Sequence, residues 1–259
     1  ENDRRLETPQ GVLAARVRAA LAPDLPSVFG TTGSIGRMDV VHLRAIWERS
    51  HQLAGARLVV AGRVTPELAL ALASELELPQ SGAVDYPAGE DPGNPRAEPE
   101  VNRQWIVEAY RLQGAEEVAA LVAGHWLAER ARTVGEDFEV GVEIWDLGGS
   151  RALVLTSAAF PRSSAAQRAW FDRALTDAAA EVTDFEVARV ASELRTEITM
   201  ASRTPWGLSE IVGQAWDAGN GPEGVETLLA NLEALTAAQV SQFFATLSAS
   251  TPVREELSP

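Results

Sequence analysis

The chain combines long stretches whose apolar residues recur at helical spacing with a few short stretches rich in β-branched and aromatic residues. Apolar residues three and four positions apart share one face of a helix, so they predict amphipathic helices. Short β-rich runs bounded by turn residues predict strands. We expect helices over 10–21, 40–53, 66–76, 115–132, 163–182 and 183–202, three shorter helices beginning near Pro205, Pro222 and Thr236, and strands over 57–61, over 104–112 and, as a pair, within 138–160.

Local signals support several of these elements. Thr183 and Glu186 have the spacing of a capping box, which satisfies free amides at a helix start. Gly148 and Gly149 separate two alternating runs, a pattern typical of a β-hairpin. Asp39 precedes an apolar run and is a suitable N-cap. The core face of the helix that follows Asp39 is predicted to consist of Val40, Leu43, Ile46 and Trp47.

The order of elements divides the chain into two parts. Residues 79–101 are proline-rich and poor in apolar residues, which predicts an extended linker. A helix-rich part, 1–78, precedes the linker, and a part with one strand, a helix, two strands and further helices, 102–259, follows it. This order predicts an α+β fold in which helices cover one face of an antiparallel sheet.

Charge and composition exclude several classes of function. The 259 residues include 22 basic and 37 acidic side chains, a net charge of −15, which disfavours binding to nucleic acid. The chain has no cysteine, so it offers neither a thiol nucleophile nor a thiolate metal site. No apolar stretch is long enough to span a bilayer. We expect a soluble protein of the bacterial cytoplasm, although composition alone leaves the compartment open.

Familiar catalytic patterns are missing from the sequence. The segment after the 57–61 run contains a single glycine, Gly62, and fits no phosphate-binding loop. The three histidines, His42, His51 and His125, form neither HExxH nor HxxEH, so no helix carries the two histidines of a self-contained catalytic zinc site. No GxSxG motif is present either.

One segment, 29–75, carries a more specific signal. It contains an ordered series of short motifs, each weak by itself, that ends in a β-rich run, a glycine and a helix opened by proline. In order these are Phe29-Gly30, Thr32-Gly33, Leu43, Trp47, the run 58–62 and Pro66-Glu67.

This series resembles the closing segment of the first domain in the pitrilysin/insulinase family of zinc metallopeptidases, which includes the mitochondrial processing peptidase and bacterial relatives. The later part is similar to the second domain of that family, from the strand at Gln104 to the long helix that begins at Thr183. The resemblance implies two peptidase-like αβ domains, the first incomplete at its N-terminus over 1–78 and the second over 102–259.

The departures from the family pattern bear on function. Active members carry HxxEH upstream of the matching region and a third zinc-ligand glutamate about where this chain begins, so Glu1 can be that glutamate or its neighbour, or an ordinary solvated residue. Active members also bind the substrate backbone with an arginine and a tyrosine of the second domain. Here Arg130 or Arg132 takes the arginine position, and Phe138, which has no hydroxyl to donate, takes the tyrosine position.

Three functions remain compatible with this pattern. The first, which we favour, is a non-catalytic peptidase-like subunit that forms a heterodimer with a zinc-bearing HxxEH homologue and encloses peptides with it. The second is the C-terminal portion of an active zinc metalloendopeptidase whose HxxEH segment lies upstream of Glu1. The third is a non-enzymatic scaffold. In the favoured case the chain holds no cofactor, zinc is bound by the partner, and the chain is inactive alone.

Overall fold

The computed structural model describes residues 8–23, 36, 38–50, 58–75, 100–112, 117–133, 138–147, 150–217, 221 and 223–259. These residues form two compact units. Glu1, the Gly148-Gly149 turn and most of the predicted linker lie outside the described residues, so the boundaries 1–78, 79–101 and 102–259 stay a prediction. The first unit contains the described residues within Glu1–Pro26, Gly93–Arg195 and Leu228–Pro259, and the second those within Ser27–Pro92 and Thr196–Thr227.

A four-stranded antiparallel sheet forms the centre of the first unit. The order of its strands is β2-β3-β1-β4, so the last strand in sequence pairs with the first. The predicted strand over 104–112 and the predicted hairpin are confirmed, because β2 and β3 pair along their whole lengths. The strands are β1 (Gln104–Leu112), β2 (Phe138–Asp146), β3 (Arg151–Ala159) and β4 (Val253–Leu257).

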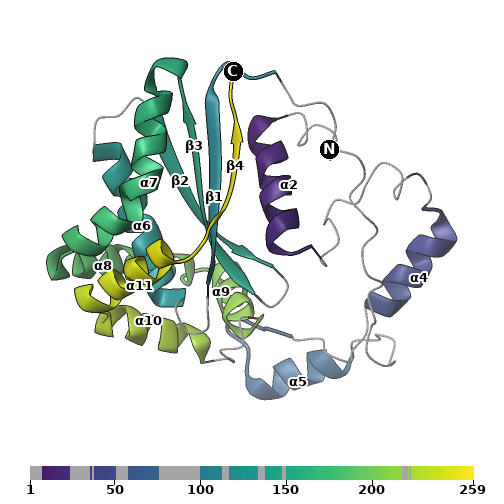
Figure 1. The fold of residues 1–259 in the computed structure, drawn as a ribbon. Coiled ribbons are helices and arrows are strands. Elements are labelled where there is room, and N and C mark those ends of the chain that lie inside the picture. Colours follow the sequence, from purple (N-terminus) through teal and green to yellow (C-terminus); the bar gives the residue numbers. More distant parts are fainter. Residues whose placement is uncertain are drawn as a thin grey trace. The chain divides into compact units, whose positions relative to one another are not determined.

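Helices cover one face of this sheet, as the sequence predicts. Helix α6 (Glu117–Thr133) packs against β2, and α11 (Ala237–Ala249) packs against α6 and against α7 (Ser164–Glu181). Figure 1 shows α6 and α7 on the same side of the sheet. Trp126 of α6 and Phe244 of α11 meet with their ring centroids 5.7 Å apart, and both are buried.

Helix α2 (Pro9–Leu21) lies on the opposite face of the sheet (Figure 1). The Thr8 hydroxyl accepts a hydrogen bond of 3.1 Å from the Gly11 amide and so caps the helix at its start. The helix contacts β1 and β4. Its buried residues are Leu13, Val17 and Leu21, which share a core cluster with Val107, Ala109, Leu147, Ala152, Val154 and Leu257.

The remaining helices also begin near the predicted residues. The Thr183–Glu186 capping box is confirmed, since the Glu186 carboxylate accepts from the Thr183 amide at 3.1 Å and the Thr183 hydroxyl accepts from the Glu186 amide at 3.3 Å. Thr236 and Gln239 form a second capping box at the start of α11. Helices α8 (Asp184–Ala201), α9 (Pro205–Asp217) and α10 (Gly224–Ala234) complete this part of the chain, with a short 3-10 helix over Pro161–Ser163.

In the second unit the predicted core face of one helix is wrong. Helix α4 (Val40–Ser50) forms where expected, but Val40 is 74% exposed and Leu43 and Trp47 are about half exposed. The side chain of Ile46 lies outside the described residues. Apolar spacing predicts which residues share a face, whereas burial also requires a neighbour for that face.

The predicted strand over 57–61 is also absent from the described residues of that segment. Leu58–Ala61 pairs with none of the four strands. A β-rich run becomes a strand only where another strand accepts its backbone hydrogen bonds. The helix after it, α5 (Pro66–Ser74), does form, with Pro66 in its first turn and Thr65 as its N-cap.

None of the helices in the described ranges is both long and apolar enough to cross a membrane.

Close packing of α6 on β2 depends on Gly124. A Cβ atom at this position would lie 2.9 Å from Val142 Cγ1, closer than carbon atoms tolerate. We expect Gly124→Val to lower the free energy of unfolding by about 1–3 kcal/mol, because the extra methyl groups would force α6 away from the strand. Thermal or urea denaturation measures this change.

Gly213 in α9 is the matched control, since nothing lies within 4 Å of a Cβ built there. Gly213→Ala should raise stability by about 0.5–1 kcal/mol through helix propensity. An equally stable Gly124→Val variant would contradict this packing of α6 on the sheet.

Candidate functional site

The two predicted substrate-binding arginines lie in the last turn of α6. Arg130 forms an ion pair with Glu181 at the end of α7, and its guanidinium also lies 5.9 Å from the centroid of the Trp126 ring. Arg132 is exposed. Their role in binding a substrate stays a prediction.

Phe138, the third predicted residue, begins β2 and is only 5% exposed. Its ring meets Trp170 of α7 edge-on, with centroids 6.3 Å apart. The side chain therefore contributes to the core under α7, and most of its surface is out of reach of a ligand. The described contacts do not join Phe138 to Arg130 or Arg132.

A groove beside α2, on the other face of the sheet, is the strongest candidate for a binding site. We call it the sheet groove. It has a volume of about 600 Å³ and is open to solvent. Antiparallel pairing places Glu139 of β2, Ala158 of β3 and Trp105 of β1 side by side across it. The groove is lined by Gln10, Arg103, Trp105, Phe138, Glu139, Gly141, Glu143, Thr156, Ser157 and Ala158.

Charge is distributed unevenly in the sheet groove. Glu139 and Glu143 lie on the same face of β2, roughly 13 Å apart along the strand. The Glu143 carboxylate accepts a hydrogen bond of 2.8 Å from the Trp145 indole. Arg103 lies near the other end, and its guanidinium stacks 4.3 Å from the centroid of the Phe160 ring. The groove thus offers carboxylates, one guanidinium and an aromatic surface.

This arrangement favours binding over catalysis. Thr156 supplies a hydroxyl, whereas the buried hydroxyl of Ser157 accepts a hydrogen bond of 3.0 Å from Gln167 of α7, and none of the residues lining the groove is a histidine that could act as a base. Among the residues that the structure describes, no group of three or more His, Cys, Asp or Glu could hold a metal ion. The zinc that the family resemblance implies therefore has no fitting ligand set among the described residues.

A second polar site is buried under α7, and the sequence analysis missed it. We call it the polar cluster. Glu108 of β1 is almost fully buried and accepts a hydrogen bond from the Tyr110 hydroxyl. Arg254 of β4 lies 3.5 Å from the Glu108 carboxylate and donates a hydrogen bond of 2.8 Å to Asp172 of α7. Arg254 also donates to Glu256 at 2.9 Å.

Burial sets the protonation of this cluster. It raises the pKa of Glu108 above its ordinary value, although the Tyr110 hydroxyl and Arg254 oppose the shift. Burial, with the Glu108 carboxylate nearby, also raises the pKa of Tyr110. Burial alone would lower the pKa of Arg254, but Asp172 and the two glutamates raise it overall. Arg254 thus stays charged and joins β4 to β1 and α7.

Further hydrogen bonds extend the cluster along β4. Arg168 of α7 donates to Glu256 at 3.1 Å and to Gln104 at 3.0 Å. Gln104 in turn donates to Glu256 at 3.0 Å. Every one of these contacts joins structural elements to one another, so the cluster serves the fold. A charged residue in the middle of an apolar strand, as Glu108 is in QWIVEAYRL, is the signal that could have revealed it.

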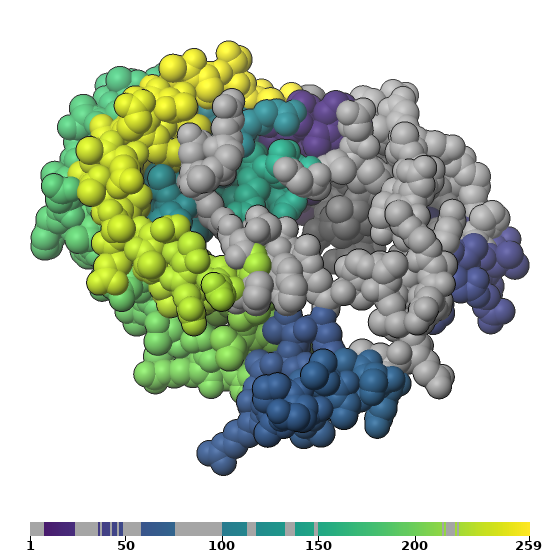
Figure 2. Space-filling model, turned by 90° about the horizontal axis from the view of Figure 1, so that it is seen from below, coloured from purple at the N-terminus to yellow at the C-terminus, as the bar shows by residue number. Residues whose placement is uncertain are grey.

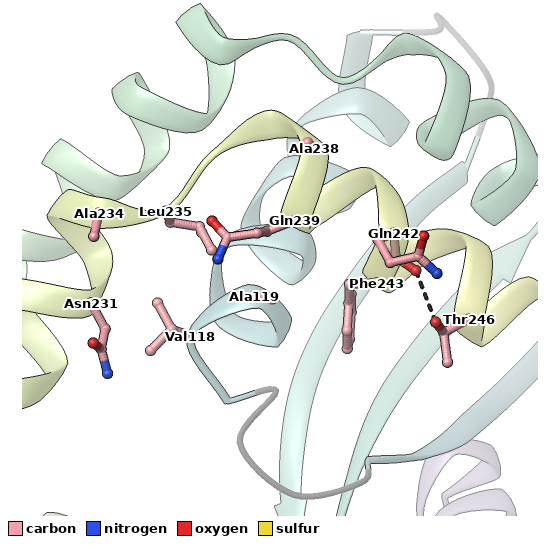
Figure 3. Close-up of a pocket in the computed structure, with 10 residues that line it drawn as sticks. All are labelled: Val118, Ala119, Asn231, Ala234, Leu235, Ala238, Gln239, Gln242, Phe243 and Thr246. Carbon is pink, nitrogen blue, oxygen red and sulfur yellow. Dashed lines mark hydrogen bonds between the residues drawn. The ribbon is translucent and has the colours of Figure 1, made fainter.

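Another hollow lies between α6, α10 and α11 (Figure 3) and has a volume of about 570 Å³. Its polar side chains are Asn231, Gln239, Gln242 and Thr246. Gln239 already accepts hydrogen bonds from Thr236, and the Thr246 hydroxyl donates to the Gln242 carbonyl at 2.9 Å. The hollow lacks an ionisable group, so it is not a candidate for catalysis.

Comparisons with known proteins give similarity in structure alone. No family model matches the sequence, and no curated protein does. An inactive domain of an M16 peptidase from Pseudomonas fluorescens superposes with a TM-score of 0.77 at 13% identity, over 98% of this chain and 66% of that one. A protease from Helicobacter pylori gives a TM-score of 0.72 at 11% identity, over 89% and 62%. A chain of complex III from Candida albicans gives 0.72 at 11%, over 98% and 68%.

These similarities concern the fold. The chain spans 62% and 66% of the lengths of the two bacterial proteins. The predicted α+β fold, with helices on one face of an antiparallel sheet, is present in the first unit of this chain. The chain thus has the fold of the pitrilysin-like M16 peptidases, and one of the solved domains that share this fold is an inactive one.

Proposed function

We propose that this chain is a non-catalytic peptidase-like half that pairs with a zinc-bearing HxxEH homologue to enclose and cleave peptides. Its fold similarity to an inactive M16 peptidase domain carries the proposal. The resemblance adds support, because Phe138, which has no hydroxyl to donate, takes the position of the tyrosine with which active members bind the substrate backbone. In such a pair the homologue binds the catalytic metal, and this chain provides part of the surface that encloses the peptide.

The sheet groove is the surface that we assign to the peptide. Extended peptides bind well where a strand edge offers backbone groups and neighbouring side chains offer pockets. Strand β2 is at the edge of the described sheet, and its exposed residues Glu139, Gly141 and Glu143 line the groove. Trp105 provides an aromatic surface beside them.

The isolated chain should bind no stoichiometric zinc and cleave no unstructured peptide, whereas its complex with an HxxEH homologue from the same genome should cleave such a peptide. Metal analysis and a fluorogenic peptide assay measure both properties, and a chelator should abolish the cleavage. One equivalent of tightly bound zinc in the isolated chain, with chelator-sensitive cleavage, would show instead that the chain is itself a peptidase.

A variant of the same complex tests the two arginines. If Arg130 and Arg132 hold substrate, replacing both with alanine should lower turnover at least tenfold while the complex stays intact. The ion pair of Arg130 with Glu181 is exposed, so its loss should change stability little. Alanine at Arg173 and Arg195, two arginines on other helices, is the matched control and should leave turnover unchanged.

A scaffold without peptide chemistry is the second candidate, because a chain of complex III shares the fold. It predicts the same pairing with a homologue and no cleavage by the pair. A stable complex that cleaves none of a broad peptide library would favour the scaffold.

A further inference from the structure

Two opposite charges line the sheet groove without pairing. Arg103, directly before β1, and Glu139 of β2 are both exposed in the groove. Among the described residues neither forms an ion pair or a side-chain hydrogen bond, and the guanidinium of Arg103 is held only by its contact with the Phe160 ring. The groove therefore offers an unpaired cation and an unpaired anion to a ligand.

The register of the strands keeps these two charges apart. Glu139, Ala158 and Trp105 form one row across β2, β3 and β1, and Arg103 comes two residues before Trp105. Neighbouring strands lie about 4.8 Å apart, so the Cα atoms of Arg103 and Glu139 are separated by roughly 12 Å. The side chain between them in this row, Ala158, is small, which leaves the surface of β3 open to a ligand.

Stacking orients the guanidinium of Arg103. Its Cζ atom lies 4.3 Å from the centroid of the Phe160 ring, and Phe160 directly follows β3. A ring on one face of a guanidinium leaves the N–H donors at the edge available. These donors match a carboxylate, which accepts two parallel hydrogen bonds from them. Arg103 is thus suited to bind a carboxylate in the groove.

Helix α2 also favours an anion at the Arg103 end of the groove. Gln10, in the first turn of α2, lines the groove. The last residue of the helix, Leu21, accepts a hydrogen bond from Arg111 near the other end of β1, so the helix begins at the Arg103 end. Figure 2 looks onto that other end and shows α2, in purple, beside strands in teal. The first turn of a helix carries a partial positive charge, which attracts a carboxylate.

The size of the groove fits the end of a peptide. Its volume of about 600 Å³ lies within the range of pockets that enclose a drug-sized ligand, so it holds a few residues rather than a long segment. The carboxylate at the C-terminus of a peptide is ionised at neutral pH whatever the sequence of the peptide. Capture of this carboxylate is a recurring mode of peptide recognition.

We infer that the sheet groove binds the C-terminal end of a peptide, with the terminal carboxylate at Arg103 and the side chain of a terminal lysine or arginine at Glu139. The inference rests on the proposed function, in which this groove holds the peptide. Charge complementarity carries it, because such a ligand places an anion at the cation of the groove and a cation at its anion. A peptide bound by its N-terminus would leave Arg103 unpaired.

Glu139 is better placed than Glu143 to select the basic side chain. The Glu143 carboxylate already accepts a hydrogen bond of 2.8 Å from the Trp145 indole. Glu143 also lies four residues further along β2, away from Arg103. Trp105, in the same row as Glu139, provides apolar surface for the methylene groups of the basic side chain.

Peptide binding to the isolated full chain tests the inference without any cleavage. The probe is a short peptide of alanine and serine that ends in lysine and carries a fluorophore at its N-terminus, and fluorescence anisotropy measures its affinity. Conversion of the terminal carboxylate to an amide should weaken binding at least tenfold, because Arg103 loses a charged acceptor. Replacement of the lysine with norleucine, which lacks the charge, should weaken binding at least threefold.

Three variants assign these effects to single residues. Arg103→Gln should bind the acid and amide forms of the peptide equally. Glu139→Gln should bind the lysine and norleucine peptides equally and still prefer the acid to the amide. Arg173→Gln, at an exposed arginine of α7 on the opposite face of the sheet, is the matched control and should bind as the unaltered chain does. All three replace exposed side chains, so circular dichroism should show an unaltered fold.

Three results would overturn the inference: no binding of the lysine peptide by the isolated chain, equal binding of its acid and amide forms, or equal losses of affinity in Arg103→Gln and Arg173→Gln. Equal binding of acid and amide, together with cleavage by the complex with an HxxEH homologue, would remove this inference and keep the proposed function. Selective binding of the acid form without cleavage by that complex would uphold the inference and remove the peptidase function. The two proposals therefore fail under different observations.

Discussion

Alanine in place of Phe244 is expected to lower the free energy of unfolding by about 3–5 kcal/mol. Phe244 is fully buried in α11, where it contacts Trp126 of α6 and Phe243 beside it. Truncation removes the aromatic side chain from the place where α11 packs on α6, and the surrounding side chains can close the cavity only in part. Urea unfolding followed by circular dichroism measures the change.

Phe185→Ala is the matched control for this prediction. Phe185 is 78% exposed in α8, so the same change of side chain should alter stability by no more than about 0.5 kcal/mol. Equal effects at both positions would show that α11 does not close the core over the sheet.

Replacing Arg254 with methionine is expected to destabilise the chain by about 3–5 kcal/mol at neutral pH, because it leaves the Glu108 carboxylate buried without its cation. Methionine keeps much of the apolar volume of arginine, so the loss reports mainly on charge. The double variant Glu108→Gln with Arg254→Met should recover much of the loss, since it leaves no buried charge unpaired. A double variant as unstable as the single one would contradict the assigned role of Glu108.

The effect of Arg254→Met should also depend on pH. The pKa of Glu108 is raised in the folded state, so its contribution to stability is present below its unfolded pKa and is lost as the pH rises through the folded pKa. Arg254 opposes the upward shift in the pKa of Glu108. Without Arg254 the pKa of Glu108 rises further, so stability is lost over a wider range of pH. The stability difference between the variant and the unaltered chain should therefore shrink on acidification from about pH 7 to about pH 4.5. A stability difference that grows on acidification would contradict the stabilisation of the Glu108 carboxylate by Arg254.

Local patterns were sufficient to predict most elements of the fold. Thr183 with Glu186 predicted the start of α8, and the alternating runs beside Gly148 and Gly149 predicted β2 and β3. Strand β4 was missed because its sequence, VREEL, is short and mostly charged, so it lacks the alternation of apolar and polar residues that predicts a strand. The charges of Arg254 and Glu256 are acceptable there only because side chains of α7 pair with them, which no local pattern shows.

Predictions of strand pairing and of burial, which depend on another element packing nearby, were confirmed less often. Leu58–Ala61 has the composition of a strand and Val40 the spacing of a core residue, but neither has the required partner within the described residues. The same holds for the candidate site. Phe138 was identified from its place in the sequence, whereas its burial follows from Trp170 of α7. The sheet groove depends on strand register and on the position of α2, and neither can be read from the sequence alone.

The pairing of β4 with β1 has a consequence for the rate of folding. Gln104 and Glu256 hydrogen-bond across 152 positions of sequence, whereas β2 and β3 are neighbours along the chain. Closing so long a loop costs conformational entropy before any contact repays it, and proteins dominated by such distant pairings fold slowly. The β2–β3 hairpin can form within microseconds. The edge of β1 that pairs with β4 forms its hydrogen bonds later, and until then it can pair with strands of other molecules.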